Sequence, residues 1–434
     1  MRESSIPAEG SRVAVVGGGI AGMTAAYLLS RRYDVRLFEA GPRLGGHTYT
    51  VPVEENGREL QIDMGFIVYN ERTYPRFIRL MEELKVASEA STMSFSVRCE
   101  KSGLEYNGSS LNHLFAQRRN IFRPSFYSML NGIIRFHRVA PALLEDESEP
   151  TLREFLARER FSGPFVDNYL IPMIAAIWST EPEEMFSFPA RNLVQFLDNH
   201  GMLQVRNRPQ WRVITGGSRR YVEAMEKFLG DRSRTASPIE WVRRQGDRVE
   251  VKVRGGETES FDQVVLATHS DQALRLLADA DDTEREILGA IPYQDNDVVL
   301  HTDRSLLPRN PLVWASWNYH LNPPRPNGAQ MTYYMNMLQN LATSQNGPAN
   351  RHYCVTLNRT DEIDPSTVLH RVTMAHPLYT REGVAGQKRW PEVNGVRRTW
   401  FCGAWWTWGF HEDGVRSALR VARALGVDPG WAAP

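Results

Sequence analysis

The stretch from Val13 to Thr48 decides the fold, and it reads V-A-V-V-G-G-G-I-A-G-M-T-A-A-Y-L-L-S-R-R-Y-D-V-R-L-F-E-A-G-P-R-L-G-G-H-T. The apolar run over 13–16 predicts a buried parallel strand, 21–29 has helical periodicity, and 35–38 predicts a second strand. Gly17, Gly19 and Gly22 follow the first strand at G-x-G-x-x-G spacing, and Glu39 ends the second strand. This order predicts a Rossmann-type dinucleotide-binding unit.

Each of these positions has a physical role. Gly17 permits the tight turn, Gly19 lets the backbone approach a pyrophosphate, and Gly22 lets the helix pack closely on the strand. The helix N-terminus offers free N–H groups and a partial positive charge to that pyrophosphate. Glu39 would accept hydrogen bonds from a ribose 2′-OH. The alternative is a glycine-rich turn in another kind of α/β protein, which the acid at this spacing disfavours.

The next segment distinguishes FAD from NAD. Arg43-Leu44-Gly45-Gly46-His47-Thr48 resembles the R-x-G-G-x-x-T extension of flavoproteins of the amine oxidase and phytoene desaturase group. In that group a second glycine pair lets the chain pass close to the flavin end of FAD. Asp63 and Gly65 resemble the D-x-G segment that returns beneath the isoalloxazine. The resemblance implies FAD, and we predict that it is bound non-covalently because Cys402 is wrongly placed for a covalent link.

The C-terminal signature T-W-F-C-G-A-W-W-T-W-G-F-H-E-D-G-V runs from Thr399 to Val415 and precedes a helix predicted over 416–425. Asp413 or Gly414 would cap that helix, whose amides could face flavin N1 and O2 and favour reduction. The placement resembles the motif that ends FAD amine oxidases. No metal site is predicted. The predicted cofactor-binding residues are Gly17, Gly19, Ile20, Ala21, Gly22, Glu39, Ala40, Arg43, Gly45, Gly46, His47, Gly65, Phe66, Ile67, Ile239, Thr268, Gly403, Ala404, Asp413, Gly414 and Val415.

A closer resemblance covers nearly the whole chain. The strings D-M-G-F-I-V-Y-N, F-L-D-N-H-G, W-A-S-W-N-Y, H-P-L-Y and G-A-W-W-T-W-G-F-H-E-D-G look like an uncharacterised bacterial family of NAD/FAD-binding proteins. Members are often encoded beside cyclopropane-fatty-acid-synthase-like methyltransferases, and some are implicated in desaturating methylated fatty acyl chains toward furan fatty acids. The resemblance implies a lipid acyl substrate and a functional link to a methyltransferase.

Two departures from amine oxidases bear on catalysis. Ala404 stands where an acid usually binds the ribityl chain, and the position of a lysine near flavin N5 falls near Asn296, which we therefore treat as a catalytic candidate. His411 corresponds to the place of an aromatic cage residue, and it is either the acid/base or a residue that only shapes the flavin pocket. His376 is a low-odds site for a covalent flavin link, and His200 is more often structural than catalytic at a helix end.

The composition limits the classes of function. The 434 residues carry 51 Lys+Arg and 51 Asp+Glu, so no global field favours nucleic acid, and the three cysteines show no disulfide framework. No apolar run approaches the ~18 residues of a membrane span, and the polar first ten residues lack a signal-peptide core. We expect a soluble cytoplasmic protein, with peripheral contact at the inner membrane face as an option.

Two stretches of the sequence indicate how the substrate domain is built. From 291 to 373 the strands alternate and are aromatic, which predicts an antiparallel sheet. Residues 106–144 contain no Asp or Glu but several arginines and many aromatics. The favoured interpretation is a helical domain with an apolar core, and the alternative is a surface for membranes or a gate to an apolar tunnel. The predicted substrate-pocket residues are Trp314, Trp317, Tyr333, Trp405, Trp408 and Phe410.

The predicted architecture is α/β. A Rossmann-like FAD-binding domain is made from 1–75, 206–285 and 386–434, and an α+β substrate domain from 76–205 and 286–385 is inserted into it. Four functions compete: an acyl-chain desaturase or oxidase, a flavin-dependent fatty acid double-bond isomerase, an amine oxidase, and a non-catalytic flavoprotein partner of a lipid methyltransferase. A long apolar cavity with a basic mouth would favour the first.

Overall fold

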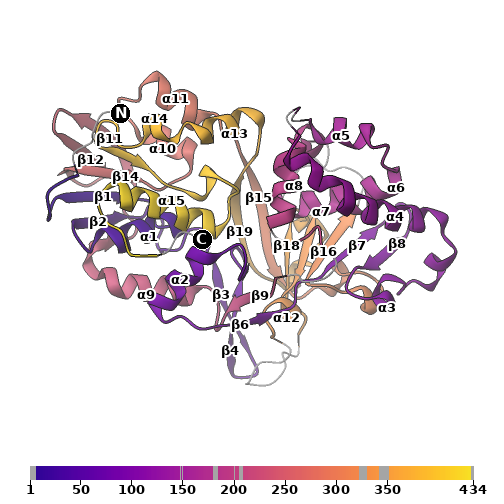
Figure 1. Ribbon diagram of the computed structural model, residues 1–434. Helices are drawn as coiled ribbons and strands as arrows, with labels where there is room; N and C mark the ends of the chain where they lie inside the picture. Colours follow the sequence, from indigo (N-terminus) through magenta and orange to yellow (C-terminus); the bar gives the residue numbers. More distant parts are fainter. Residues whose placement is uncertain are drawn as a thin grey trace.

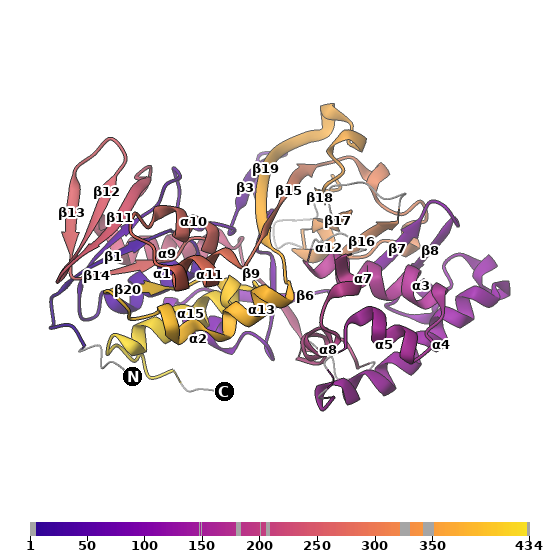
Figure 2. The same ribbon diagram turned by 90° about the horizontal axis from the view of Figure 1, so that it is seen from above.

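The computed structural model describes residues 6–146, 148, 150–178, 184–199, 201–204, 209–321, 330–341 and 351–431. Two lobes are joined by the long strands β15 (Tyr293–His301) and β19 (Val368–Pro377), as Figures 1 and 2 show. The described part of the chain contains no helix that is both long and apolar enough to cross a membrane.

The first lobe is built on a parallel five-stranded sheet in the order β10-β2-β1-β14-β20. The strand V-A-V-V is fully enclosed, as parallel strands with helices on both faces are. The predicted strand–helix–strand order at the N-terminus is confirmed. The strands are β1 (Arg12–Val16), β2 (Asp34–Phe38), β10 (Ser233–Arg234), β14 (Gln263–Leu266) and β20 (Thr399–Phe401), and the main helices are α1 (Ile20–Leu29), α9 (Arg219–Leu229), α10 (Ser270–Leu276), α11 (Asp282–Gly289) and α15 (His411–Ala424).

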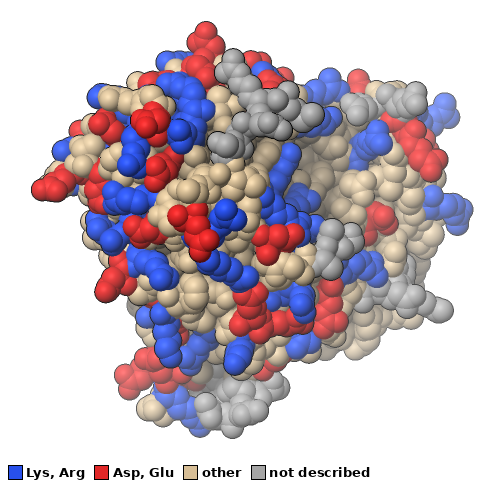
Figure 3. Space-filling view, turned by 60° about the vertical axis from the view of Figure 1, so that its left-hand side comes forward, with Lys and Arg blue, Asp and Glu red and all other residues tan. Residues whose placement is uncertain are grey.

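This lobe also contains a small antiparallel sheet in the order β11-β12-β13, and residues 239–253 form its first hairpin. Its strands are β11 (Ile239–Gln245), β12 (Arg248–Val253) and β13 (Thr258–Phe261). Acidic and basic side chains are interspersed on the face of the molecule shown in Figure 3.

The segment over 60–68, which contains Asp63 and Gly65, does not form one continuous strand. It is divided into β4 (Arg58–Asp63), which pairs with β3 (Thr50–Glu55), and β5 (Val68–Asn70), which joins a three-stranded sheet with β9 (Trp211–Ile214) and β6 (Ser88–Ser91). Between them the Phe66 N–H donates to the carbonyl of His47 over 2.9 Å. The chain therefore leaves the ladder to follow the 43–48 loop.

The second lobe is a seven-stranded sheet in the order β19-β15-β18-β17-β16-β7-β8, antiparallel except where β16 meets β7. The predicted antiparallel sheet is confirmed, and helices cover one of its faces (Figure 2). Its remaining strands are β7 (Phe95–Cys99), β8 (Leu104–Asn107), β16 (Trp317–Leu321), β17 (Met331–Tyr334) and β18 (Cys354–Leu357). Its longer helices are α4 (Pro124–Val139), α5 (Leu152–Arg158), α7 (Ile171–Trp178) and α8 (Ala190–Asn199).

Helix α2 (Pro75–Leu84) differs from the predicted domain division. We expected it in the substrate domain, but Phe77, Leu80 and Met81 belong to the apolar core of the first lobe. The periodicity of the segment predicts the helix correctly, but periodicity carries no information on which core its apolar face joins. The first lobe therefore extends to the end of α2. The short helices are α3 (Leu111–Leu114), α12 (Met335–Leu338), α13 (Arg381–Lys388) and α14 (Trp390–Val393).

Candidate functional site

In the first glycine loop a side chain would clash at Gly17 and Gly22 but would meet no atom at Gly19. A Cβ on Gly17 would lie 2.8 Å from the carbonyl oxygen of Ala267, and a Cβ on Gly22 would lie 1.8 Å from that of Gly17. A Cβ on Gly19, in contrast, would meet no atom within 4 Å. Gly19 precedes α1 and offers no side-chain cap, so the amides of Ile20 and the residues after it have no side-chain acceptor at this end. The loop is an uncapped helix N-terminus beside vacant space, which suits a phosphate group.

The second glycine pair lies directly against the first loop. Gly45 bridges to Gly19, and its N–H donates to the carbonyl of Gly18 over 2.8 Å. A Cβ on Gly46 would lie 3.0 Å from the Cα of Gly19. The two glycine motifs, separate in the sequence, therefore form one cradle.

The Arg43 side chain stabilises the loop that forms the second half of the cradle. Its guanidinium donates to the carbonyls of Thr48 at 2.9 Å and Gly46 at 3.0 Å, and it lies over the Tyr49 ring at 3.9 Å. The side chain was predicted to bind the cofactor. In the structure its donors close the 43–48 loop, so its contribution to the site is the shape of that loop.

Glu39 is held at the edge of the cradle by backbone donors. Its two carboxylate oxygens accept from the N–H groups of Gly18 and Gly41, each over 2.7 Å. The side chain is only partly buried, so lone pairs remain open toward solvent. The Ser237 N–H donates to the Glu39 carbonyl over 2.8 Å, which brings the segment ending at Ile239 beside Ala40. Three predicted cofactor-binding residues, Glu39, Ala40 and Ile239, thus lie on one side of the cradle.

The C-terminal helix begins earlier than predicted, at His411, and its N-terminus packs against that of α1. A Cβ on Gly414 would lie 2.7 Å from the side chain of Ile20, so only glycine allows this approach, and Val415 is fully buried beside it. Asp413 lies inside the first turn, and its carboxylate accepts the N–H groups of Trp408 and Phe410, each over 3.1 Å. The helix N-termini of α1 and α15 therefore face the same region.

Glu412 positions α2 beside the site, which the sequence did not predict. Its carboxylate accepts the N–H groups of Arg76 at 3.0 Å and Phe77 at 2.9 Å, and it forms an ion pair with the Arg76 guanidinium. It thus caps α2 from another helix. A capping residue so distant in sequence leaves no local signal.

Asp63 joins three segments at the rear of the site. Its carboxylate accepts from the N–H of Ser218 at 3.0 Å, from the Ser218 hydroxyl at 2.7 Å, from Thr50 at 2.5 Å and from the side-chain amide of Gln339 at 2.9 Å. Burial raises the pKa of Asp63 to about 6, against the opposing effect of the hydroxyl donors. Asp63 therefore fixes the start of α9 relative to both lobes.

His411 is enclosed in the first lobe. Its Nε2 lies 3.0 Å from both the Thr48 hydroxyl and the Tyr221 hydroxyl, and its ring stacks on Phe66 with centroids 3.6 Å apart. Burial holds the pKa of His411 well below its usual range. Of the two predicted roles, these contacts favour the one in which His411 shapes the flavin pocket, because the imidazole ties α15 to the 43–48 loop. The acid/base role stays a prediction. Ile67 is buried in the neighbouring apolar cluster.

Three histidines meet instead where the two lobes join. The ring centroid of His47 lies 5.6 Å from that of His269 and 5.5 Å from that of His376. Burial lowers the pKa of His269 to about 4 and, with a contribution from His47, that of His376 to about 3. All three rings are therefore neutral near pH 7. The described residues contain no group of three or more His, Cys, Asp or Glu arranged to hold a metal ion.

Asn296 lies beside this histidine group. Its side-chain amide nitrogen is 3.3 Å from Nδ1 of His376, and its oxygen accepts from Asn358 over 2.9 Å. The structure thus places the residue at the expected lysine position next to the loop that carries His47. His269 was missed, although it directly follows the predicted Thr268. His200 lies outside the described residues.

The six predicted substrate-pocket residues do not form one pocket. Trp405 is buried and donates to the carbonyl of Thr268 over 3.0 Å, so it packs inside the first lobe beside Gly403, where a Cβ would lie 2.2 Å from its indole nitrogen. Trp314 donates to the carbonyl of Pro308 and packs on Tyr334, away from the junction of the lobes. Their assignment to the pocket stays a prediction, because these contacts do not bring the two rings together with the other four. Ala404 begins a short turn after β20.

The other four lie near the helices of the second lobe. Trp317 and Tyr333 form an edge-to-face pair at 5.2 Å on the sheet. Phe410 stacks on Phe196 of α8 at 5.2 Å, and Trp408 lies 6.1 Å from the same ring. Aromatic side chains of the C-terminal signature thus reach across to the helical lobe. Phe196 was missed because its helical spacing is also that of an ordinary core residue.

The residues of the cradle fit FAD. The vacant space at Gly19, the uncapped start of α1, the carboxylate of Glu39 at its edge and the start of α15 nearby suit a pyrophosphate, a ribose and a flavin in turn. Cys402 is fully buried, and burial raises the pKa of its thiol, so it is unsuited to a covalent link. The fold and the cradle define a flavoprotein of the Rossmann type.

Comparison with known proteins gives the family. The family described as flavin containing amine oxidoreductase matches residues 20–374, so the chain belongs to this family of oxidoreductases, whose cofactor is FAD. An amine oxidase of Oncorhynchus mykiss is 27% identical over 274 residues, which are 59% of this chain and 49% of that protein. The chain spans about half the length of the curated relatives it matches.

Solved structures share the fold. A protein of Exiguobacterium sp. 255-15, provisionally named a protoporphyrinogen oxidase, has a TM-score of 0.68 at 19% identity, with 95% of this chain and 98% of that chain covered. A fatty acid isomerase of P. acnes that produces CLA has a TM-score of 0.65 at 16% identity, with 96% and 99% covered. At these identities the likeness concerns the fold alone.

Proposed function

We propose that the protein is an FAD-dependent oxidoreductase that removes a hydride from a C–H bond of a hydrophobic substrate. The substrate class that the observations favour is an unsaturated or methyl-branched fatty acyl chain, which the enzyme would desaturate or oxidise. Bound FAD would supply the hydride acceptor, and the chain's own residues would bind the substrate, orient it and exclude water.

The observation that carries the proposal is the apolar junction between the C-terminal signature and the helical lobe. Phe410 and Trp408 meet Phe196, and Tyr379 lies 6.5 Å from Trp408 and 6.4 Å from Phe188. An acyl chain gains about 0.8 kcal/mol for each CH₂ buried on such a surface. A small amine has few CH₂ groups to bury there and gains correspondingly less from apolar contact.

The carboxylates of Asp413 and Glu412, at the start of α15, already have partners within the protein. Asp413 accepts two backbone N–H groups and pairs with Arg416 at 3.0 Å, while Glu412 caps α2 and pairs with Arg76. An ammonium group entering here would therefore have to compete with these partners. The neutral histidines and the amide of Asn296 offer no charge to an amine either, which supports a substrate without a cationic centre.

The test is anaerobic reduction of the bound flavin by a panel of candidates. We expect unsaturated or methyl-branched fatty acids, or phospholipids carrying them, to bleach the oxidised flavin, and simple amines to leave it unchanged. Phe410→Ser should slow bleaching by the lipid, whereas Trp314→Phe, in the turn before β16 where the ring packs on Tyr334, should not. Faster reduction by amines than by every lipid tested would refute the lipid proposal.

Amine oxidation is the second candidate, because the curated relatives are amine oxidases. The fold shared with a fatty acid isomerase raises a third, in which the hydride is returned at another carbon. Product analysis separates these two from desaturation: an oxidised amine, a moved double bond, or an additional one. If no candidate changes the flavin, a non-catalytic role as partner of a lipid methyltransferase takes precedence.

A further inference from the structure

The outer end of the helical lobe exposes an unusual number of large apolar side chains. Phe122 is 85% exposed, Leu111 76% and Ile134 59%. Among the described residues, the strongly exposed large apolar side chains outside this end are Ile6, Phe228, Leu369 and Val396. We name this surface the 111–134 face, and it consists of Leu111, Arg118, Arg119, Ile121, Phe122, Tyr127 and Ile134 with the neighbouring Leu312.

Helix α4 carries apolar side chains on both its buried and its exposed side. Phe126, Met129 and Phe136 are buried in the lobe. Tyr127 and Ile134, spaced by seven residues, lie on the exposed side with Asn131 between them. The turn at 118–122 carries Phe122 beyond the start of the helix. Single exposed apolar residues are ordinary, but a gathered set marks an interaction site.

The same face carries cations without acidic partners. Arg118 donates to the Phe115 carbonyl and to Asn112, and Arg119 donates to the Gly103 carbonyl. Neither is in an ion pair with a described residue, and 106–144 contains no Asp or Glu. Their charge is therefore available to an outside partner.

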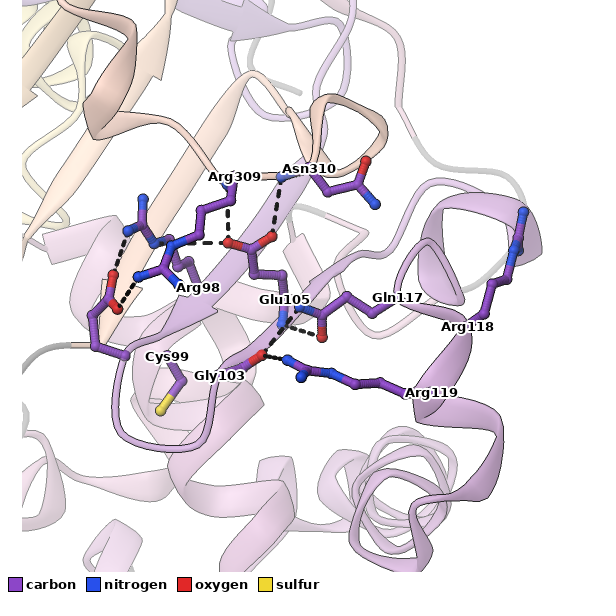
Figure 4. A pocket seen from close by; sticks show the side chains of 10 residues that line it. Arg98, Cys99, Gly103, Glu105, Gln117, Arg118, Arg119, Arg309 and Asn310 are labelled. Atoms are coloured by element: carbon purple, nitrogen blue, oxygen red, sulfur yellow. Dashed lines mark hydrogen bonds and ion pairs between the residues drawn. The ribbon is translucent and has the colours of Figure 1, made fainter.

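The nearest acids are neutralised beside the face, as Figure 4 shows. Glu105 forms an ion pair with Arg98 at 3.7 Å and accepts the backbone N–H groups of Arg309 and Asn310 at 2.9 and 3.2 Å. Glu100 pairs with Arg98 at 2.5 Å and with Arg309 at 2.9 Å. Arg118 is turned away from this network in the figure. The acids therefore balance other arginines and leave the 111–134 face basic.

We infer that the 111–134 face docks the protein on an anionic lipid surface. Apolar side chains flanked by arginines suit the interface of a bilayer, where the rings and aliphatic tips enter the headgroup region and the guanidinium groups meet lipid phosphates. The face lies at the end of the molecule remote from the FAD-binding lobe, with α3 and α4 outermost (Figures 1 and 2).

The test is co-sedimentation of the full-length, FAD-loaded protein with vesicles. We expect binding to vesicles that contain phosphatidylglycerol, weaker binding to phosphatidylcholine alone, and a decrease with added salt. Because each arginine near an anionic surface contributes about 1 kcal/mol, Arg118→Glu with Arg119→Glu should lower the partition coefficient roughly thirtyfold or more. Phe122→Ser should lower binding to both kinds of vesicle.

The control variant carries the same kinds of substitution on the surface of the first lobe. Arg254→Glu with Phe228→Ser alters an exposed arginine and an exposed aromatic, and vesicle binding should persist. Flavin absorbance and thermal midpoint report the fold of every variant. Wild-type protein that stays in the supernatant, or 111–134 variants that sediment as wild type does, would overturn the inference. So would a concentration-dependent dimer that Phe122→Ser separates without changing vesicle binding. Reduction of the flavin by detergent-dispersed fatty acid is measured separately, so failure of docking and failure of the proposed function are distinguishable.

Discussion

Replacing Gly19 with alanine separates cofactor binding from folding. The backbone at Gly19, with φ −75° and ψ −179°, is accessible to alanine, and its Cβ would meet no protein atom within 4 Å. The free energy of unfolding of the apoprotein should therefore be unchanged or raised by about 0.4–1 kcal/mol, because the unfolded chain loses freedom. The added methyl group would occupy the space that we assign to the pyrophosphate of FAD.

The expected loss of FAD affinity follows from the contacts at the helix N-terminus. Holding the phosphate away from even one amide removes a charge-assisted hydrogen bond worth roughly 1.5–3 kcal/mol, which is a loss of roughly tenfold to a hundredfold. Gly22→Ala is the contrasting variant, since its Cβ would lie 1.8 Å from the Gly17 carbonyl oxygen. Such overpacking should destabilise the apoprotein itself by about 1–3 kcal/mol.

Two measurements on apoprotein decide the matter. Titration with FAD, followed by quenching of flavin fluorescence, gives the affinity, and urea unfolding gives the stability. The reasoning predicts lost affinity with intact stability for Gly19→Ala, and lost stability for Gly22→Ala. Undiminished FAD affinity in Gly19→Ala would show that the vacant space is not the phosphate site.

Three further predictions concern the same lobe. Glu39→Ala should lower FAD affinity roughly tenfold or more through loss of a charged ribose acceptor, while Glu54→Ala on the exposed β3 should not; unchanged flavin occupancy of Glu39→Ala after gel filtration would exclude the ribose role. Acid precipitation should release free FAD into the supernatant, and yellow colour kept in the pellet would instead indicate a covalent link. The pKa of His269 is lowered to about 4 against about 6.5 in the unfolded chain, so the unfolded state binds more protons between these values. The contribution of neutral His269 to the free energy of unfolding, up to about 3 kcal/mol, is fully present above pH 6.5 and is lost as the pH falls toward 4. The urea midpoints at pH 7 and pH 5 should therefore differ less in His269→Asn than in the wild type. An equal difference in the two proteins would contradict the assignment.

The glycine motifs were predictable from the sequence because their function is local. Gly17, Gly19, Gly22 and Glu39 all lie within one strand–helix–strand unit, and the structure brings them together in one cradle. The pairing of the second glycine motif with the first follows from the resemblance to known flavoproteins, since spacing alone does not bring Gly45 to Gly19.

The direction of side chains was not predictable. His411, Trp405 and Trp314 are the residue types that a catalytic pocket uses, yet the first two are enclosed in the first lobe and Trp314 packs away from the junction. Which face a side chain takes is set by tertiary packing, which a single sequence does not report. For the same reason, contacts between distant segments, such as that of Glu412 with the start of α2 or of His269 with His47, left no local pattern.

The most direct test of the central claim is the mass of the product after a single anaerobic turnover. Holoenzyme would be mixed with one equivalent of an unsaturated or methyl-branched fatty acid, and the extracted lipid compared with the starting material as the flavin bleaches. Desaturation predicts a product lighter by two hydrogens, formed in proportion to the flavin reduced. A product of unchanged mass with a moved double bond, or flavin reduced only by amines, would contradict the account.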